Sequence, residues 1–450
     1  MSIATGSRGA WTDEGLNTSQ VRNYVNHNYF NLLDSDNLLK TPLFSLFLYP
    51  FFKLFGISML GSRVITLLFC ATLLFSFFYK KSTLFIGLVF VSTTMMFLPI
   101  HQYSHLCLAE MFSSMLIVIS LLFYSFSNIE KKRFQIILFF LLLFMAVLFK
   151  IQFIYVLMIP LLAIALDYFR NKSLENRKHL FLAGFSLMIL VAGILFVWLI
   201  PFSREWIQIA KQQSGSFSFD EITIDLIWAN LRVNFLSKRF VLFTLFFIFS
   251  FFLAIKNLIN KQYKVEYFTL LVGSFFWFFV ELHKLGYTYL PMRYLISFYL
   301  SMGFFSSVVT GYSLSQLKIN YKVISIVSIF TLLSFNCYLY QQAFTSRKYM
   351  VKEMNSYFKK VTTKKDVVIG PWAATFTWES KCLSYPIWTD FLAKREILKY
   401  YNPDFIVGEV GEEDSGYAYK SNDICLDKIG DSLRSAKIAL WNVILYKVRK

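Results

Sequence analysis

Ten apolar runs recur along the chain, and their lengths predict its main elements. Each run is about long enough to cross a hydrocarbon core of roughly 30 Å as a helix when some tilt is allowed. They predict membrane helices near residues 62–79, 83–99, 106–126, 134–149, 151–167, 180–201, 239–255, 265–282, 293–313 and 323–341. The pattern therefore predicts a mostly α-helical, polytopic membrane domain over residues 62–341.

The composition supports a membrane protein. The 450 residues are 56% hydrophobic and 19% aromatic, only 16% are charged, and the mean hydropathy is +0.52. Soluble domains carry about a quarter charged residues, so an ordinary soluble enzyme, a disordered chain and a disulfide scaffold are excluded. The net charge of +18 would favour nucleic acid in a soluble protein. Here the basic residues orient loops, and we expect membrane lipids as partners and no nucleic acid.

Basic residues collect in every second loop between the predicted spans. The loops near residues 80–81, 131–133, 170–178, 256–264 and 318–322 hold 14 Lys and Arg, against 6 in the alternate loops. The positive-inside rule places the first set in the cytoplasm. Residues 1–61 then form an extracytoplasmic first loop, in which the short apolar run 40–56, interrupted by Pro50, predicts an interfacial helix.

An outer N-terminus raises the question of how it crosses the membrane. Residues 1–4 have neither the basic end nor the apolar run of a signal peptide. We therefore expect a first membrane helix ahead of this sequence, and unaided translocation of the N-terminal tail is the alternative.

The last part of the chain has a different pattern. Residues 342–450 carry more charge and contain strand-like runs at 366–370, 405–407 and 440–446, with helical segments at 349–360 and 389–401. This pattern predicts a small extracytoplasmic α/β domain. Cys382 and Cys425 fall in this domain, and they form either a disulfide or two free thiols. The sequence contains no CxxC pair, so a zinc ribbon or a redox motif of that type is excluded.

Carboxylates on the predicted outer side are candidates for acid–base chemistry. Asp13 and Glu14 are adjacent and precede Gly15. A carboxylate at a membrane surface is partly desolvated, which raises its pKa and makes it a better base. The alternative is that Asp13 caps a helix beginning near Leu16. Glu110, at the outer end of a predicted span, is either functional or close enough to the interface to reach water.

Cations and histidines lie in the same outer loops. Lys150 and Arg293 lie at the outer ends of predicted membrane helices, and the same outer loops contain the pair His283–Lys284 and Tyr294. Cations at the outer end of a helix pair suit a phosphate partner. The alternatives are a snorkelling lysine and a helix-end anchor beside Tyr294. The histidines could bind a divalent metal or be ordinary loop residues; they are His101, His105 and His283.

The order of these features over residues 8–340 resembles the GT-C glycosyltransferases. The resemblance rests on Trp-Thr-Asp-Glu-Gly at 11–15, Ala-Glu-Met at 109–111, Phe-Lys-Ile-Gln at 149–152 and Arg-Tyr-Leu at 293–295. Within the family it resembles the bacterial and archaeal branch related to protein O-mannosyltransferases and aminoarabinose transferases. A family helix ahead of the Asp-Glu element is not matched here.

The resemblance implies an activity and roles for particular residues. A hexosyl- or pentosyltransferase would move a sugar from a polyprenyl-phosphate carrier to a hydroxyl of a lipid, glycan or protein of the cell envelope, with inversion. Asp13 would be the general base, with Glu14 as its neighbour or substitute. Glu110 would orient the sugar, and Lys150 and Arg293 would hold the phosphate. Family members differ in metal use, so no cofactor is fixed and a divalent metal stays open.

Two other classes remain. A transporter or a flippase of lipid-linked glycans would also have many spans, but it would place charged or helix-breaking residues near the bilayer midplane. A non-catalytic scaffold would need no carboxylate at a cavity. The candidates here collect on one side, which favours a one-sided reaction.

Overall fold

In a computed structural model the chain forms two compact units, which are described separately. The first unit comprises residues 1–66, 105–109 and 343–450, and the second comprises residues 67–104 and 110–342. The structure describes residues 9–29, 42–104, 106–126, 132–171, 174–201, 203, 223–260, 263–287, 290, 292–316, 319–345, 349–387, 397–411, 416, 419–420, 423–438 and 441–449.

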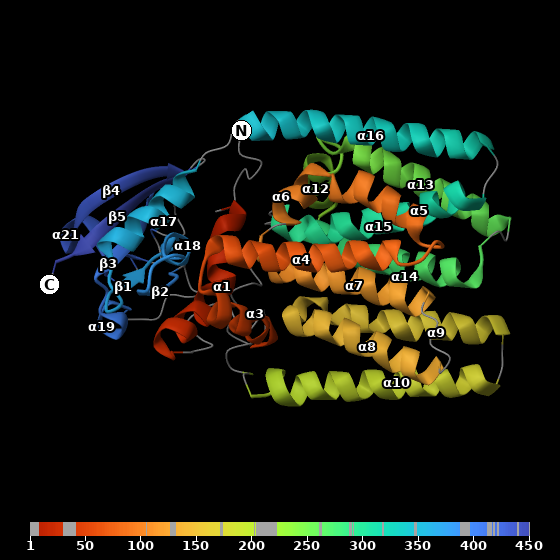
Figure 1. Cartoon of the computed structure of the whole chain (residues 1–450), viewed down its shortest axis with the longest axis horizontal. Helices are drawn as coiled ribbons and strands as arrows, with labels where there is room; N and C mark the ends of the chain where they lie inside the picture. Colours follow the sequence, from red (N-terminus) through yellow and green to blue (C-terminus); the bar gives the residue numbers. More distant parts are fainter. Residues whose placement is uncertain are drawn as a thin grey trace. The chain divides into compact units, whose positions relative to one another are not determined.

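Helices make up the described part of the second unit (Figure 1). In chain order they are α4 (Met59–Phe78, which begins in the first unit), α5 (Leu84–Val89), η2 (Phe90–Met95), α6 (Leu98–Ser104), α7 (Ala109–Phe126), α8 (Lys132–Phe149), η3 (Ile151–Leu157), α9 (Met158–Asn171), α10 (Leu174–Ile194), η4 (Leu195–Leu199), α12 (Ile224–Asn234), α13 (Val241–Ile259), α14 (Val265–Glu281), η6 (Leu282–Gly286), η7 (Met292–Leu295), α15 (Ile296–Gln316) and α16 (Ile319–Thr345).

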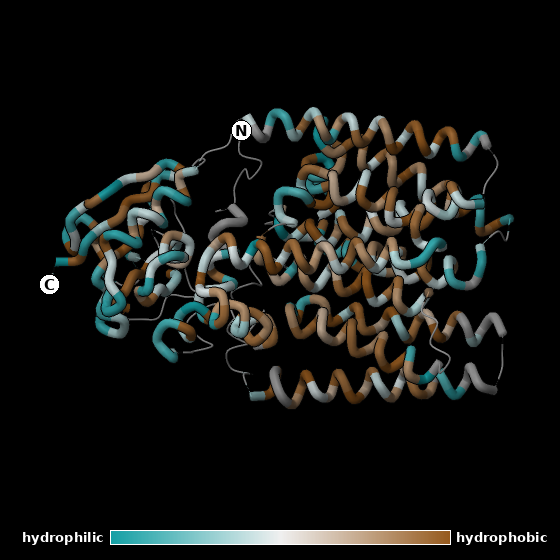
Figure 2. The backbone as a smooth tube through the Cα atoms, viewed as in Figure 1, coloured by the Kyte–Doolittle hydropathy of each residue, from teal (hydrophilic) through white to brown (hydrophobic). Residues whose placement is uncertain are grey.

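The polytopic membrane fold predicted from the sequence is confirmed, whereas the number of ten spans is not. Six described helices are long and apolar enough to cross a membrane, and a bent pair raises the number to seven. The bent pair falls on the predicted span 83–99, where residues 84–95 and 98–104 meet at 92°. The predicted spans 134–149, 151–167 and 180–201 fall on shorter apolar helices. Apolar residues predominate along the helices of this unit (Figure 2).

Helix α15 is the centre of the second unit. Its side chains are buried from Ile296 to Ser313, and it packs against α5, η2, α13 and α14. A β-carbon at Gly311 would lie 2.7 Å from Ile86 Cα, so the glycine is what allows α5 to approach. Such close approach at small residues is how membrane helices gain packing energy without a hydrophobic driving force between them.

The first unit combines N-terminal helices with the C-terminal α/β domain. Its described helices are α1 (Gly9–His27), α3 (Pro42–Phe55), the start of α4, α17 (Met350–Val361), α18 (Ala373–Phe376), α19 (Ile397–Tyr401) and α21 (Leu426–Ile429). Helix α3 lies on the apolar run that predicted an interfacial helix, and it is too short to span a membrane.

A five-stranded mixed sheet forms the core of the α/β domain, which confirms this part of the predicted fold. The strands β1 (Val367–Ile369), β2 (Leu383–Tyr385), β3 (Phe405–Val410), β4 (Gly430–Ile438) and β5 (Trp441–Val448) lie in the order β2-β1-β3-β5-β4. β1 pairs in parallel with β2 and β3, and β5 pairs antiparallel with β3 and β4.

Helix α17 covers this sheet because its apolar residues share one face. Met354 and Phe358, four residues apart, are fully buried against Val407 and Leu445 of β3 and β5. The thiols of the domain are free: Cys382 is buried and Cys425 exposed, so of the two alternatives the unpaired one holds.

Candidate functional site

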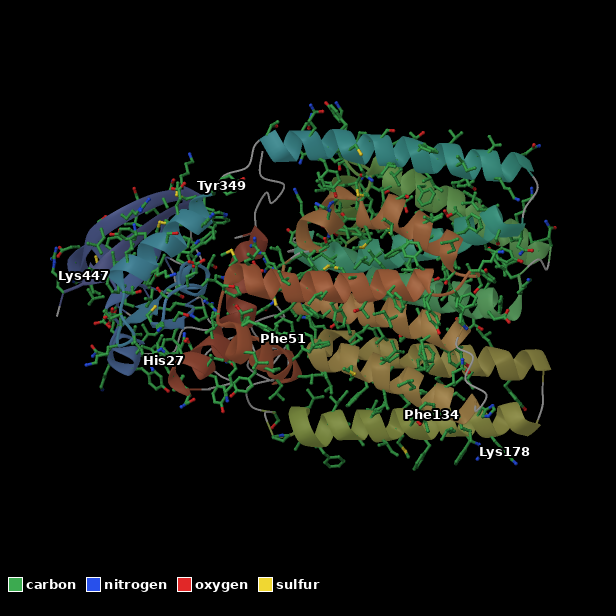
Figure 3. The ribbon with its side chains drawn as sticks, viewed as in Figure 1. His27, Phe51, Phe134, Lys178, Tyr349 and Lys447 are labelled. Atoms are coloured by element: carbon green, nitrogen blue, oxygen red, sulfur yellow. The ribbon has the colours of Figure 1, made fainter. Side chains whose placement is uncertain are left out.

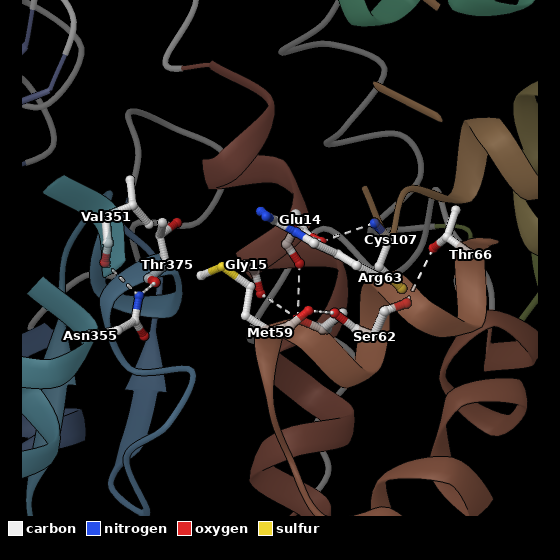
Figure 4. Close-up of polar contacts among 11 residues, drawn as sticks. Glu14, Gly15, Met59, Ser62, Arg63, Thr66, Cys107, Val351, Asn355 and Thr375 are labelled. Carbon is white, nitrogen blue, oxygen red and sulfur yellow. Dashed lines mark hydrogen bonds and ion pairs between the residues drawn. The ribbon is translucent and has the colours of Figure 1, made fainter. Parts of the chain in front are cut away.

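Glu14 lies at the centre of a polar network in the first unit. Its side chain is only 1% exposed. Arg63 of α4 donates to both of its oxygens, with Nη2–Oε2 at 2.8 Å and Nε–Oε1 at 3.2 Å, and the backbone N–H of Cys107 donates to Oε1 at 3.1 Å (Figure 4). Such a forked, charge-assisted contact fixes orientation as well as charge. Glu14 therefore ties α1 to the start of α4 and to the segment ahead of α7.

Asp13 precedes Glu14 inside the same helix. Helix α1 begins at Gly9, so Asp13 lies in the second turn and is not the cap of a helix starting near Leu16; that alternative is wrong. The side chain of Asp13 lies outside the described part of the chain. Its role as a base stays a prediction.

Helix α1 is held against the C-terminal domain by a buried arginine. Arg22 Nη2 donates to Ala374 O at 2.6 Å and to Gly15 O at 3.0 Å, and its guanidinium lies 4.3 Å from the ring centre of Trp378. Burial lowers the pKa of Arg22 to about 9, a sign of how far the charge is removed from water. The contact with the tryptophan face offsets part of that cost.

Further contacts extend this anchor along α1. Asn23 exchanges hydrogen bonds with the backbone of Ser384 in β2, at 3.1 and 3.4 Å, and His27 Nε2 lies 2.7 Å from Lys381 O. Residues near the two ends of the chain thus form one packed body, and the helix that carries Asp13 and Glu14 is positioned by the α/β domain.

A second polar cluster lies in the second unit and brings predicted residues together. Glu110, in the first turn of α7, forms an ion pair with Lys150, which directly follows α8. The residues are 9% and 5% exposed. Lys150 Nζ also lies 5.6 Å from the ring centre of Tyr294. Glu110 is therefore not a carboxylate that simply reaches water, and Lys150 does not snorkel.

Beside this pair stands a carboxylate that the sequence analysis did not select. Glu281, at the end of α14, is fully buried and forms an ion pair with Lys284. It accepts hydrogen bonds from Tyr155 OH, from Trp277 Nε1 at 3.3 Å and from Ser297 Oγ at 2.9 Å. Groups from α14, η3 and α15 thus converge on one carboxylate, as a buried charge requires.

Both lysines and Glu110 line one cavity, whereas Glu281, the ion-pair partner of Lys284, is not part of its lining. The volume of the cavity is 150 Å³, which corresponds to about five waters at roughly 30 Å³ each. This is room for a phosphate-sized group but not for a whole lipid-linked sugar. The lining residues are Glu110, Lys150, Gln152, Phe153, Tyr155, His283, Lys284, Tyr287, Tyr294 and Ser297.

The cavity gathers five of the predicted site residues and leaves Arg293 beside it. Glu110, Lys150, His283, Lys284 and Tyr294 all line it. Arg293 is outside the lining, with its guanidinium 5.1 Å from the Tyr294 ring centre. The Tyr294 ring is thus near two cations, Lys150 of the cavity and Arg293 outside its lining.

Each lysine of the cavity has a carboxylate partner. Lys150 is paired with Glu110, and Lys284 is paired with Glu281. Lys284 Nζ also donates to Tyr294 O at 2.9 Å and to Ser297 Oγ at 2.6 Å. Because these contacts already order the two lysine side chains, an anion can bind to them at little further cost in side-chain entropy.

One sequence signal could have identified Glu281. It ends the apolar run 265–282 in the same way as Glu110 begins the run 106–126, and an ionisable residue at the end of a membrane helix is a functional candidate by default. Tyr155, Trp277 and Ser297 carry no such signal, since they are ordinary residues of apolar segments.

The described residues include no group of three His, Cys, Asp or Glu that could hold a metal ion. His101 packs its ring against Tyr340 at 4.5 Å, His283 Nδ1 lies 2.6 Å from Val280 O, and His105 lies outside the described residues. A divalent metal therefore stays an open expectation with no site assigned.

Solved structures share this fold. Two crystal structures of ArnT from Cupriavidus metallidurans match, one bound to undecaprenyl phosphate with a TM-score of 0.61 and 12% identity, and one in the apo state with 0.57 and 10%. Each match covers 96% of this chain and 93% of the ArnT chain. No protein-family model matches the chain, and no curated protein does. The chain therefore has the GT-C fold of ArnT, as the resemblance in its sequence predicted.

Proposed function

We propose that the chain is a membrane glycosyltransferase that moves a sugar from a polyprenyl-phosphate carrier to an acceptor hydroxyl, with inversion, on the extracytoplasmic side of the membrane. The observation that carries the proposal is the cavity lined by Lys150 and Lys284, each paired with a carboxylate. An ArnT of the same fold is bound to undecaprenyl phosphate, and two fixed ammonium groups suit the phosphate of such a lipid.

The charge change in the reaction explains why lysines are needed. The acceptor oxygen attacks the anomeric carbon, the bond from that carbon to the phosphate oxygen breaks, and polyprenyl phosphate leaves with the electron pair. The donor is a phosphodiester with about one negative charge, and the leaving phosphate approaches two. Cations placed where charge develops stabilise the transition state more than the ground state.

The proton of the acceptor hydroxyl needs a base, and Asp13 is the proposed one. Glu14, its neighbour, already accepts hydrogen bonds from Arg63 and from Cys107 N–H, so it acts as the anchor of α1. Glu110 and Glu281 hold the two lysines before the donor binds, and Glu110 is the proposed contact to the transferred sugar. Arg293 and His283 extend the phosphate site.

The proposed side of the membrane follows from the direction of the helices. The cavity is built at the start of α7 and α15 and at the end of α8 and α14. The opposite ends lead into the loops rich in Lys and Arg, and Phe134 of α8 and Lys178 of α10 lie at that other end of the second unit (Figure 3). The positive-inside rule assigns that end to the cytoplasm.

Release of polyprenyl phosphate tests the proposal. Full-length protein in nanodiscs is given radiolabelled polyprenyl-phosphate sugars, with a membrane extract as acceptor source. We expect release from at least one donor, with a loss of at least 100-fold in kcat for Asp13→Asn, since general base catalysis contributes about 10²–10⁴-fold. Lys150→Gln should lose a similar factor.

One control variant and two contrary outcomes make the result interpretable. Lys81→Gln removes an exposed lysine from the loop at the opposite helix ends and should leave release unchanged. No release from any donor, together with equal donor binding by wild type and Asp13→Asn, would overturn the transferase and favour a flippase. Release that is insensitive to both Asp13→Asn and Lys150→Gln would show that the wrong site was chosen.

A further inference from the structure

A groove on the C-terminal domain lies outside the sites described so far. It runs between α17 and the edge strand β4, and its volume is 680 Å³, within the range of about 300–1,000 Å³ typical of small-molecule sites. Seven residues line it: Tyr349, Lys352, Glu353, Ser356, Tyr357, Lys360 and Arg434. Tyr349 stands at the start of α17 (Figure 3).

The groove is strongly cationic. Lys352, Lys360 and Arg434 face a single carboxylate, that of Glu353. Both lysines are exposed, and within the described residues their ammonium groups form no ion pair. Lys352, Ser356 and Lys360 recur every four residues along α17, so they form a stripe about 12 Å long at 1.5 Å rise per residue.

Arg434 is positioned in the groove by a β-bulge and by a contact with Tyr357. The pairing of β4 with β5 is shifted between Ser432 and Arg434, and such a bulge changes the direction of the side chain that follows. The guanidinium of Arg434 lies 4.9 Å from the ring centre of Tyr357. This contact with the ring leaves the N–H groups of Arg434 for a planar or tetrahedral anion.

Aromatic rings supply the second element of recognition. Tyr349 is 63% exposed, and Tyr357 is half-buried against the domain core. Exposed tyrosine rings give rigid contact area at low entropic cost together with a hydroxyl for hydrogen bonding. Rings beside cations suit a ligand with apolar ring faces, hydroxyls and negative charge together.

We propose that this groove binds an acidic saccharide, with a carboxylate or phosphate on the sugar, and that it presents the acceptor glycan to the transferase. The second half of this statement rests on the proposed function. A hollow of 680 Å³ lined by tyrosine rings as well as cations favours a discrete saccharide over the plane of a bilayer, for which a flat basic face would serve.

The test measures binding to the full chain in nanodiscs of neutral phosphatidylcholine. The probes are trigalacturonate for a carboxylate, mannose 6-phosphate for a phosphate and maltotriose as the neutral saccharide. We expect at least one acidic probe to bind, at least tenfold more tightly than maltotriose. The double variant Lys352→Gln/Lys360→Gln should weaken that binding at least tenfold, and Arg434→Gln should weaken it too.

Lys359→Gln is the matched control. Lys359 is the neighbour of Lys360 but lies outside the groove, 3.8 Å from Glu379 Oε2. It should change binding less than twofold. Equal weakening by Lys359→Gln would mean unspecific attraction to a basic domain, and binding only to nanodiscs that contain phosphatidylglycerol would mean a lipid-binding face; either overturns the proposal.

The outcome is separable from that of the proposed function. If the wild-type protein releases no polyprenyl phosphate and the groove variants still lose saccharide binding, the proposed saccharide site stands. The proposed transferase activity and the role of the groove in holding the acceptor are then overturned. A transferase in which no acidic saccharide binds, or in which groove variants transfer to the native acceptor at the wild-type KM, would overturn the groove as the acceptor site.

Discussion

Gly15 marks a close approach between α1 and the C-terminal domain, and replacing it tests whether that contact positions the candidate base. A β-carbon at Gly15 would lie 2.8 Å from Thr375 N and 2.9 Å from the carbonyl carbon of Ala374. Both are backbone atoms, which cannot rotate out of the way. The change Gly15→Ala therefore has to displace α1 or α18.

Two effects of known size oppose each other in this variant. Alanine is favoured over glycine in a helix interior by about 1 kcal/mol. Overpacking a close contact costs about 1–3 kcal/mol, and a clash with backbone belongs to the upper part of that range. We expect Gly15→Ala to destabilise the first unit by about 1–2 kcal/mol, the difference between these two effects.

A second glycine isolates the helix effect. Gly184 lies inside α10, and a β-carbon there would have no heavy atom within 4 Å. Gly184→Ala should therefore leave stability unchanged or raise it by at most about 1 kcal/mol. The two variants make the same chemical change and differ only in what the added carbon meets.

Thermal unfolding of the full chain in one detergent, followed by loss of the monodisperse peak on size exclusion, gives the comparison. We expect the midpoint to fall by several degrees for Gly15→Ala and not for Gly184→Ala. Release of polyprenyl phosphate should fall as well, because Gly15 directly follows the Asp13–Glu14 pair. A midpoint for Gly15→Ala at or above that of the wild type would refute the close contact on which this reasoning depends.

Three further changes test other parts of the structure. Burial lowers the pKa of His27 below its usual 6.5, so its contribution to the stability of the folded unit is present above pH 6.5 and is lost as the pH falls from 6.5 through the lower pKa of the folded state. His27→Gln should therefore flatten the fall in thermal midpoint between pH 7 and pH 5, and an unchanged slope would contradict this. Burial raises the pKa of the Cys382 thiol to about 11, so a maleimide at pH 7 should react with the exposed Cys425 before it reacts with Cys382. Mass spectrometry of the labelled protein gives the order, and labelling of Cys382 first would show that Cys382 is not buried. Glu281→Gln leaves its buried lysine without a counter-charge and should cost about 3–5 kcal/mol, a larger fall in midpoint than any other variant here, whereas wild-type stability would mean that the pair is not formed.

The sequence predicted best what depends on short stretches of chain. Long apolar runs are local signals, so α13 to α16 fall where they were expected. The bend in the predicted span 83–99 was not foreseen, because it arises where the π-helical segment η2 passes into α6. The strands β2 and β4 were missed as well, since neither shows a clear alternation of apolar and polar residues.

Contacts between distant parts of the chain were beyond the reach of the sequence. Arg22 and Ala374 are 352 positions apart, and nothing in the local pattern of either residue indicates the other. The network of Glu281 likewise joins η3, α14 and α15. The individual residues Glu110, Lys150 and Lys284 could be selected because charge in an apolar setting is costly, but their pairing became visible only in three dimensions.

The two carboxylates affect the charge state of the lysines that line the cavity. A lysine moved from water into apolar surroundings tends to lose its proton, and a neutral amine would stabilise no phosphate. Glu110 and Glu281 supply negative charge beside Lys150 and Lys284, which favours the ammonium form before any ligand arrives. A phosphate that enters the cavity then exchanges one anionic partner for another, and the desolvation of the lysines is already met by the fold. Each carboxylate thus contributes to phosphate binding through the charge state of its lysine, and the two pairs act as one unit because both lysines line the same 150 Å³ cavity.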